Sequence, residues 1–262
     1  MFKFSVFLIL VAAAEYTWAA SLSEGRIVGG RDVSIARHPY QISLRYKSCD
    51  VCIFMHTCGG VIYNEHVILT AAHCVYKREE RSFVVVAGSD YRAGGDGFIG
   101  LVDKIVIHEN YNPALTDNDL ALVFLSTPLA FNVSNTIKPA ELTEQEPKAG
   151  SKAFVSGWGT TSEGGANSLK LQEAEVNIVD RNDCEEAYGF ERITENMLCA
   201  GTVTGGRDAC QNDSGGPLVS ADNKLVGIIS WGRGCARPEY PGVYANIAYF
   251  RSWIENTVKL SS

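Results

Sequence analysis

The chain has 262 residues, of which 46% are hydrophobic and 20% charged, and its formal net charge is −7. Residues 27–262 are long enough for one large or two small hydrophobic cores. The negative charge argues against a nucleic-acid-binding protein and is compatible with cationic substrates.

A secretory signal peptide is predicted at the N-terminus. Lys3 precedes an apolar run over residues 4–14, and the small residues Thr17 and Ala19 follow two positions apart. Because this run is short, cleavage after Ala19 is favoured over the alternative of an uncleaved anchor. No later segment is long and apolar enough to span a bilayer. We therefore expect residues 1–19 to be a signal peptide and the protein to be secreted and extracellular, with no membrane contact.

Short β-rich runs then recur between turn residues along most of the chain. They cover residues 41–46, 61–63, 67–70, 83–87, 104–108 and 120–125, and then 152–157, 171–178, 197–200, 217–219, 225–231 and 242–246. Many short strands separated by Gly, Pro, Asn and Asp predict an all-β barrel or sandwich, which periodicity alone does not distinguish.

The last segment has a helical pattern instead. Apolar residues recur there at three-to-four spacing, at Tyr249, Phe250, Trp253, Ile254, Thr257 and Val258. This spacing predicts an amphipathic C-terminal helix that packs its apolar stripe against a barrel.

Three segments carry residues suited to nucleophilic catalysis. Ser214 lies between Asp213 and two glycines, and a serine hydroxyl is a poor nucleophile unless a nearby base takes its proton. His73, in Thr-Ala-Ala-His-Cys, supplies a base, and Asp119, in Asp-Asn-Asp-Leu-Ala-Leu, supplies a carboxylate. The chain order His, Asp, Ser is that of the chymotrypsin arrangement and differs from the subtilisin and α/β-hydrolase orders.

Together with Arg26-Ile27-Val28-Gly29-Gly30, these segments resemble the trypsin-like serine proteases of chymotrypsin fold. The resemblance runs from Ile27 to the C-terminus and is strongest to insect-type trypsins. It implies one protease domain over residues 27–262, built from two six-stranded antiparallel β-barrels packed side by side, with a boundary near residues 136–148 and a C-terminal α-helix.

The resemblance also implies the catalytic roles. His73 would act as the general base for Ser214, and Asp119 would orient the imidazole and stabilise its protonated form. Asp117 is the local rival of Asp119, and we expect it to be a solvated loop charge. The other histidines have no such context, and we expect surface or packing roles for His38, His56, His66 and His108.

The amides of Asn212 and Ser214 match the oxyanion hole of the family. Asn212 departs from the family pattern, which has glycine there. Asn tolerates left-handed backbone angles better than most residues, so we expect the hole to form with an extra side chain at its rim. A non-cleaving, ligand-binding pseudoprotease is the rival function that this departure suggests.

Asp208 matches the family position at the base of the primary specificity pocket. A buried carboxylate there would pair with an entering Arg or Lys side chain. Pocket walls are implied at Ser230, Trp231, Gly232 and Gly242. The expected function is therefore a serine endopeptidase that cleaves after Arg or Lys, with a digestive role favoured over a selective cascade role because no accessory module is present.

Activation is implied at the bond between Arg26 and Ile27, with residues 20–26 as the pro-segment. The freed amine of Ile27 would pair with Asp213, so the uncut chain would be a zymogen. We expect no required metal or other cofactor, because residues 87–96, at the calcium loop of vertebrate trypsins, contain no glutamate. Polypeptide substrates and protein protease inhibitors are the expected partners of a monomer.

Eight cysteines in an exported chain predict four disulfides. The resemblance implies Cys58–Cys74, Cys184–Cys199 and Cys210–Cys235. Cys49 and Cys52 are left over: a short-range disulfide is favoured, and a zinc site with His56 and Cys58 or a redox pair are the alternatives. Of two glycosylation sequons, Asn132 is the better acceptor than Asn212, where a glycan would cover the active site.

Overall fold

The computed structural model describes residues 27–131 and 134–261. The predicted signal peptide, the pro-segment, Arg26 and the sequon residue Asn132 therefore lie outside the described residues. Within the described part, no helix is long and apolar enough to cross a membrane.

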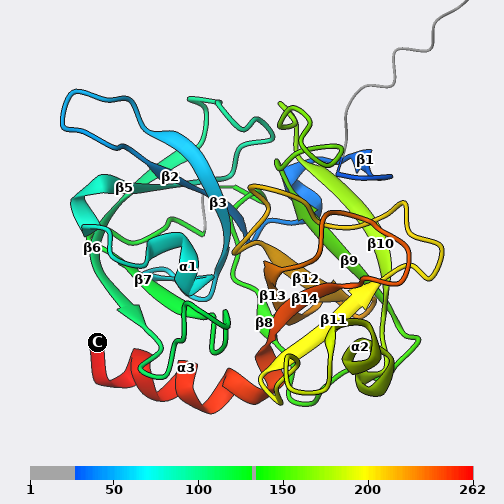
Figure 1. Ribbon diagram of the computed structural model, residues 1–262. Helices are drawn as coiled ribbons and strands as arrows, with labels where there is room; N and C mark the ends of the chain where they lie inside the picture. Colours follow the sequence, from blue (N-terminus) through cyan, green and yellow to red (C-terminus); the bar gives the residue numbers. More distant parts are fainter. Residues whose placement is uncertain (1–26, 132–133, 262) are drawn as a thin grey trace, which may run out of the picture.

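The first half of the chain forms a closed six-stranded antiparallel barrel, at the left of Figure 1. Its strands close in the order β2-β3-β4-β7-β6-β5. They are β2 (Gln41–Tyr46), β3 (Met55–Ile62), β4 (Val67–Thr70), β5 (Phe83–Ala87), β6 (Phe98–Ile107) and β7 (Ala121–Leu125). β4, β5 and β7 are buried along their whole length, which explains their continuous apolar sequences.

A second antiparallel barrel follows and closes in the order β9-β10-β11-β14-β13-β12. Its strands are β9 (Lys152–Gly157), β10 (Gln172–Ile178), β11 (Met197–Gly201), β12 (Pro217–Ser220), β13 (Lys224–Trp231) and β14 (Gly242–Asn246). Two short strands add to it: β1 (Arg31–Asp32) pairs with β10, and β8 (Glu141–Leu142) runs parallel to β13. The expected double-barrel class is confirmed.

Most expected strands have the observed bounds within one residue, but two are longer at their N-terminal ends. β3 begins at Met55 rather than at residue 61, and β6 begins at Phe98 rather than at residue 104. The added parts contain exposed or polar positions such as Met55, His56 and Ile99. Only part of each added segment is apolar, so the sequence there lacks the continuous apolar pattern of a strand that is buried on both faces.

The helices are few and mostly short. They are α1 (Ala72–Val75), α2 (Arg181–Tyr188) and α3 (Ile247–Ser261), with 3₁₀ turns η1 (Ile35–Arg37) and η2 (Glu80–Ser82). The predicted C-terminal helix is confirmed as α3. Its buried residues join a core cluster that contains residues of both barrels, and His108 of the first barrel packs against Phe250 and Trp253 at 5.3 and 4.7 Å between ring centroids. The helix starts at the end of β14 in the second barrel and runs beneath the first barrel (Figure 1).

A buried charge cluster fixes the N-terminal segment to the second barrel. Glu173 of β10 is 1% exposed and accepts hydrogen bonds from Arg31, Arg37 and His38 at 2.6–2.8 Å. Burial opposes the charge of Glu173, but these three donors outweigh it and lower the pKa of the carboxyl to about 2. The segment that follows Ile27 is thus held in place by ion pairs as well as by β1.

All eight cysteines lie in the described residues and are paired. The disulfides are Cys49–Cys52, Cys58–Cys74, Cys184–Cys199 and Cys210–Cys235. The favoured short-range bridge is confirmed, and it excludes the zinc alternative because no thiolate remains to bind a metal.

Candidate active site

His73 and Asp119 lie next to each other at neighbouring ends of two paired strands of the first barrel. His73 lies in α1, directly after β4, and Asp119 lies just before β7, the strand paired with β4. Asp119 Oδ2 is 2.7 Å from His73 Nδ1, and Asp119 Oδ1 accepts the backbone N–H of His73 at 2.8 Å. Only 2% of Asp119 is exposed. The carboxylate therefore fixes the ring with Nδ1 protonated and Nε2 free to accept a proton.

Ser230 of the second barrel also contacts the carboxylate of Asp119. Ser230 Oγ donates to Asp119 Oδ2 at 2.5 Å. We expected Ser230 only as a pocket wall, so its bond to Asp119 was missed. This contact joins the specificity pocket to the His73–Asp119 pair across the two barrels.

Asp117 is not the solvated loop charge that we expected. It is half-buried and accepts hydrogen bonds from Thr194 and Asn196 of the second barrel at 2.7 and 2.8 Å, and from Asn118 at 3.0 Å. The expectation was wrong because two of the three donors, Thr194 and Asn196, are about 80 residues away in sequence. Asp117 positions the loop that carries Asp119 and does not contact His73.

Ser214 lies on a tight turn that the neighbouring barrel holds in place. The carbonyl of Ser214 accepts the N–H of Gly59, and Gly215 N donates to Ile229 O, both at 2.8 Å. Gly215 has a φ of +82°, and a Cβ there would collide with Thr70 and Gly59. Cys74 Sγ is 3.7 Å from His73 Nε2 and also from the Ser214 carbonyl oxygen. The turn thus brings Ser214 to the side of the imidazole that carries Nε2.

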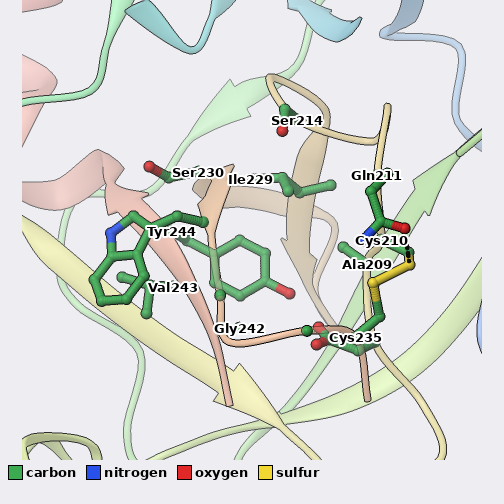
Figure 2. A pocket seen from close by; sticks show the side chains of 14 residues that line it. Ala209, Cys210, Gln211, Ser214, Ile229, Ser230, Cys235, Gly242, Val243 and Tyr244 are labelled. Atoms are coloured by element: carbon green, nitrogen blue, oxygen red, sulfur yellow. Dashed lines mark hydrogen bonds between the residues drawn. A yellow bond between two sulfur atoms is a disulfide. The ribbon is translucent and has the colours of Figure 1, made fainter. Parts of the chain in front are cut away.

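A pocket of about 220 Å³ opens beside Ser214. Figure 2 shows Ser214 at one end, Ser230 and Ile229 along the wall, and Gly242 and the Cys210–Cys235 bridge toward the other end. Asp208, Trp231 and Gly232 also line it, so the structure brings together all the expected pocket residues. A Cβ on Gly242 would lie 2.8 Å from Asp208 Oδ1, so glycine at this position keeps the carboxylate accessible.

Asp208 is a buried acid with an unsatisfied oxygen. It is 5% exposed, Oδ2 accepts the N–H of Ala236 at 3.1 Å, and Oδ1 has no hydrogen-bond partner among the described residues. Burial raises the pKa of Asp208 to about 7, since the backbone donors offset only part of the desolvation. A cationic side chain that entered the pocket would satisfy Oδ1 and stabilise the carboxylate.

Asn212 takes the backbone conformation that a glycine would take. Its φ is +70°, and its side-chain Nδ2 donates to Asn167 Oδ1 at 2.9 Å. The extra side chain is therefore held by a neighbouring loop.

His56 forms a hydrogen bond to the turn that carries Ser214, a role that its place in the sequence did not predict. His56 is buried, and its Nε2 donates to the Asn212 carbonyl at 3.0 Å while Nδ1 lies 2.8 Å from Ser43 Oγ. Burial lowers the pKa of His56 to about 4, which keeps the ring neutral and its single N–H on Asn212.

Asp213 is a further buried acid, next to the turn. It is 1% exposed and accepts the N–H groups of Gly159 and Cys210 at 2.7 and 3.0 Å. Burial raises the pKa of Asp213 to about 7 despite these donors. Ile27 is fully buried in the core of the same barrel, and its neighbour Val28 pairs with Asp208.

Arg45 of β2 reaches the loop between β5 and β6, the segment in which no calcium site is expected from the sequence. Arg45 Nη2 donates to the carbonyls of Arg92 and Gly94 at 2.8 and 3.1 Å, and Ser89 Oγ donates to Asp96 Oδ1 at 2.6 Å. These groups satisfy oxygens that a metal ion would otherwise need as ligands. The only cluster of metal-ligating types found among the described residues, Cys58, His73 and Cys74, contains a disulfide.

The sequence was also compared with known proteins. The sequence model of the trypsin family, described as "Trypsin", matches residues 27–254. Trypsin eta of Drosophila erecta is 51% identical over 90% of this chain and 91% of its own length. Trypsin zeta of Drosophila melanogaster is 50% identical over 90% of this chain and 86% of its own length, and Trypsin-1 of Astacus astacus is 42% identical over 87% and 98%.

Proposed function

Because this chain belongs to the trypsin family of serine proteases, we propose that it cleaves polypeptides after Arg or Lys and is secreted as a zymogen. It is a trypsin-like serine endopeptidase, and the finer assignment rests on one observation. Oδ1 of buried Asp208, which no described residue pairs, lies in a pocket that opens at Ser214. A guanidinium or ammonium group satisfies this oxygen, whereas an apolar side chain leaves it desolvated and unpaired.

We assign the catalytic roles from the positions of these residues and from the family to which the chain belongs. Ser214 Oγ attacks the carbonyl carbon, and His73 Nε2 takes the hydroxyl proton and then gives it to the leaving amine. Asp119, fixed by Ser230, stabilises the imidazolium that forms. The amides of Asn212 and Ser214 stabilise the oxyanion, and water repeats the sequence on the acyl-enzyme.

The zymogen assignment is supported by the burial of both Ile27 and Asp213. Cleavage after Arg26 creates an α-amine on Ile27, which already lies in the core of the second barrel. Pairing with that amine would neutralise the buried carboxylate of Asp213 and hold the turn that carries Ser214. A digestive role is the simplest for a protease of one domain, residues 27–262, with signal peptide 1–19 and pro-segment 20–26.

The experiment that tests the assignment is substitution of the nucleophile. Activated Ser214→Ala should bind a small arginyl amide normally and hydrolyse it at least about 10⁴-fold more slowly. Ser126→Ala is a matched control, because it removes the hydroxyl of an exposed serine that does not line the pocket. Near-normal turnover by purified Ser214→Ala would overturn the assignment.

A further inference from the structure

The loop that carries Asp119 has an unusual backbone conformation. It joins β6 to β7, and its last part, residues 116–118, leads directly to Asp119. Thr116 and Asn118 have φ angles of +54° and +53°, in the left-handed region that favours glycine. A β-branched residue such as Thr116 is rarely found there. Two residues of this kind next to Asp119 require other contacts that hold the segment in place.

The loop itself supplies backbone hydrogen bonds but little packing. Asn112 and Asp117 exchange both of their backbone hydrogen bonds, at 2.9 and 3.2 Å, and Leu120 N donates to Asn118 O at 2.9 Å. Residues 112–115 are exposed, and residues 116–118 are only half-buried. Packing against a core therefore contributes little to the conformation of this segment.

The side chain of Asp117 connects the segment to the second barrel. Its Oδ1 accepts hydrogen bonds from Thr194 Oγ1 and Asn196 Nδ2 at 2.7 and 2.8 Å. Asn196 Nδ2 also donates to Asn118 Oδ1 at 3.3 Å. Asn196 is 6% exposed, and its carbonyl accepts the N–H of Asn246 in β14 at 2.8 Å. A buried residue that is bonded to a barrel strand thus holds the strained segment.

The contacts of Asp117 suit a side chain that accepts on both sides. Oδ1 accepts the two donors of the second barrel, and Oδ2 accepts Asn118 Nδ2 at 3.0 Å. An ionised carboxylate accepts on both oxygens, whereas a carboxamide carries an NH₂ group on one side. Asparagine in place of Asp117 would therefore turn its NH₂ group toward a donor in either orientation. Hydrogen bonds to a charged acceptor are also stronger than those to a neutral one.

We propose that Asp117 is a positioning residue for the catalytic pair and acts from the second barrel through residues 116–118. The inference rests on the proposed function, because it concerns the same reaction. Asp119 holds the ring of His73 through Oδ2 and the backbone N–H of His73 through Oδ1. A shift of the segment would move this carboxylate relative to both nitrogen atoms and slow the proton transfer. None of the described residues that line the Asp208 pocket belongs to this loop, so substrate binding should be retained.

The test compares kcat and KM on a small arginyl amide, using proteins that begin at Ile27. Asp117→Asn should lower kcat by about tenfold and leave KM within about twofold of the parent value. Thr194→Val keeps the charge of Asp117 and removes one of its donors, so it should lower kcat by about threefold. A parent-like kcat in Asp117→Asn, or a rise in KM as large as the fall in kcat, would overturn the inference.

Relief of the backbone strain distinguishes positioning from a loss of charge. Thr116→Gly/Asp117→Asn should have a kcat at least about threefold above that of Asp117→Asn, because glycine adopts the observed φ without strain. Glu109→Gln is the matched control for charge, since Glu109 is an acid of the same loop that accepts a hydrogen bond from Trp253 of α3. It should keep the parent kcat. Failure of the rescue, or an equal loss in Glu109→Gln, would overturn the inference.

A proton NMR measurement tests the positioning without catalysis. The proton between His73 Nδ1 and Asp119 Oδ2, which are 2.7 Å apart, is deshielded by this hydrogen bond and gives a separate low-field resonance. The resonance should move upfield or broaden in Asp117→Asn and return toward the parent position in Thr116→Gly/Asp117→Asn. An unchanged resonance in Asp117→Asn would overturn the inference. If the parent fails to hydrolyse the amide but the resonance responds as expected, the proposed function fails and the positioning role stands.

Discussion

In the proposed function, Asp208 sets the substrate preference through a carboxyl group whose pKa is raised to about 7. An acid with a raised pKa is neutral below that value, so its attraction for a cation is present above about pH 7 and is lost as the pH falls. The cation itself favours the ionised form, which extends binding somewhat below pH 7 once a ligand is present.

The first prediction follows from the loss of the Asp208 charge as the pH falls below 7. The affinity for a small aryl amidine should fall by up to about tenfold for each unit of pH below 7. Inhibition constants measured from pH 5 to pH 9 check it. The Asp208→Asn variant should bind weakly at every pH, and a neutral aryl alcohol should show a flat profile in the parent. A flat profile for the amidine in the parent would contradict the prediction.

The chemically active residues of the site could be predicted from the sequence. His73, Asp119, Ser214 and Asp208 stand in short motifs whose order is informative. Contacts between distant segments left no such signal. The donation from Ser230 to Asp119 spans 111 residues, and the bond from His56 to Asn212 spans 156. Only the folded barrels bring these partners together.

At the scale of elements, the loop that joins β5 and β6 is stabilised by a side chain of the neighbouring strand β2. Arg45 of β2 reaches the carbonyls of Arg92 and Gly94 from the neighbouring strand. Burial lowers the pKa of Arg45, and the nearby Arg92 charge lowers it further, but a guanidinium remains charged at all ordinary pH values. Arg45 therefore places a permanent cation against two carbonyl oxygens of this loop.

The second prediction concerns this loop. Arg45→Met should lower the melting temperature by about 4–8 °C, because hydrogen bonds from a charged donor are lost. Thermal denaturation with and without a chelator measures it, and the parent should be insensitive to the chelator. Arg45→Lys keeps the charge and should recover part of the loss. A chelator effect on the parent as large as that of Arg45→Met would show that the loop depends on a metal.

Strand positions were predictable where both faces of a strand are buried. β4, β5 and β7 are apolar at nearly every residue and were found with their bounds nearly correct. The outer part of β6 alternates exposed and buried residues around Gly100, and its N-terminal half was missed. α2 was missed as well, because its eight residues are mostly polar and only Cys184 is buried.

For the whole molecule, the junction of the two barrels is the functional unit. The first barrel supplies His73 and Asp119, the second supplies Ser214 and Asp208, and contacts such as Gly59 to Ser214 hold them in register. The buried segment after Ile27 adds a third component. Cleavage would free the α-amine of Ile27, which would pair with the carboxylate of Asp213. The charge of Asp213 is otherwise uncompensated among the described residues.

The third prediction concerns that carboxylate. Asp213 has a pKa raised from 3.8 to about 7 in the uncut chain, so its contribution to stability is largest below pH 4 and is lost as the pH rises through 7. Pairing with the amine freed by cleavage should remove the free-energy cost of the buried Asp213 charge, which is about 4 kcal/mol at most. The melting temperature of the cut form should therefore exceed that of the uncut form by more at pH 7 than at pH 4.

A Ser214→Ala background prevents self-digestion in this comparison, and Arg26→Gln keeps the uncut sample intact. N-terminal sequencing verifies that the cut sample begins at Ile27. An Asp213→Asn variant should show no pH-dependent gain on cleavage. An equal gain at pH 4 and pH 7 in the parent would contradict the proposed ion pair.

The central claim is that the junction cleaves peptides after a cationic side chain because Asp208 lies in its pocket. The most direct measurement is kcat/KM for two peptide amides that differ only in Arg or Phe before the cleaved bond, using protein that begins at Ile27. We predict a preference for Arg of at least about 10³-fold, reduced by most of that factor in Asp208→Ser. Equal cleavage of the two amides by the parent would contradict it.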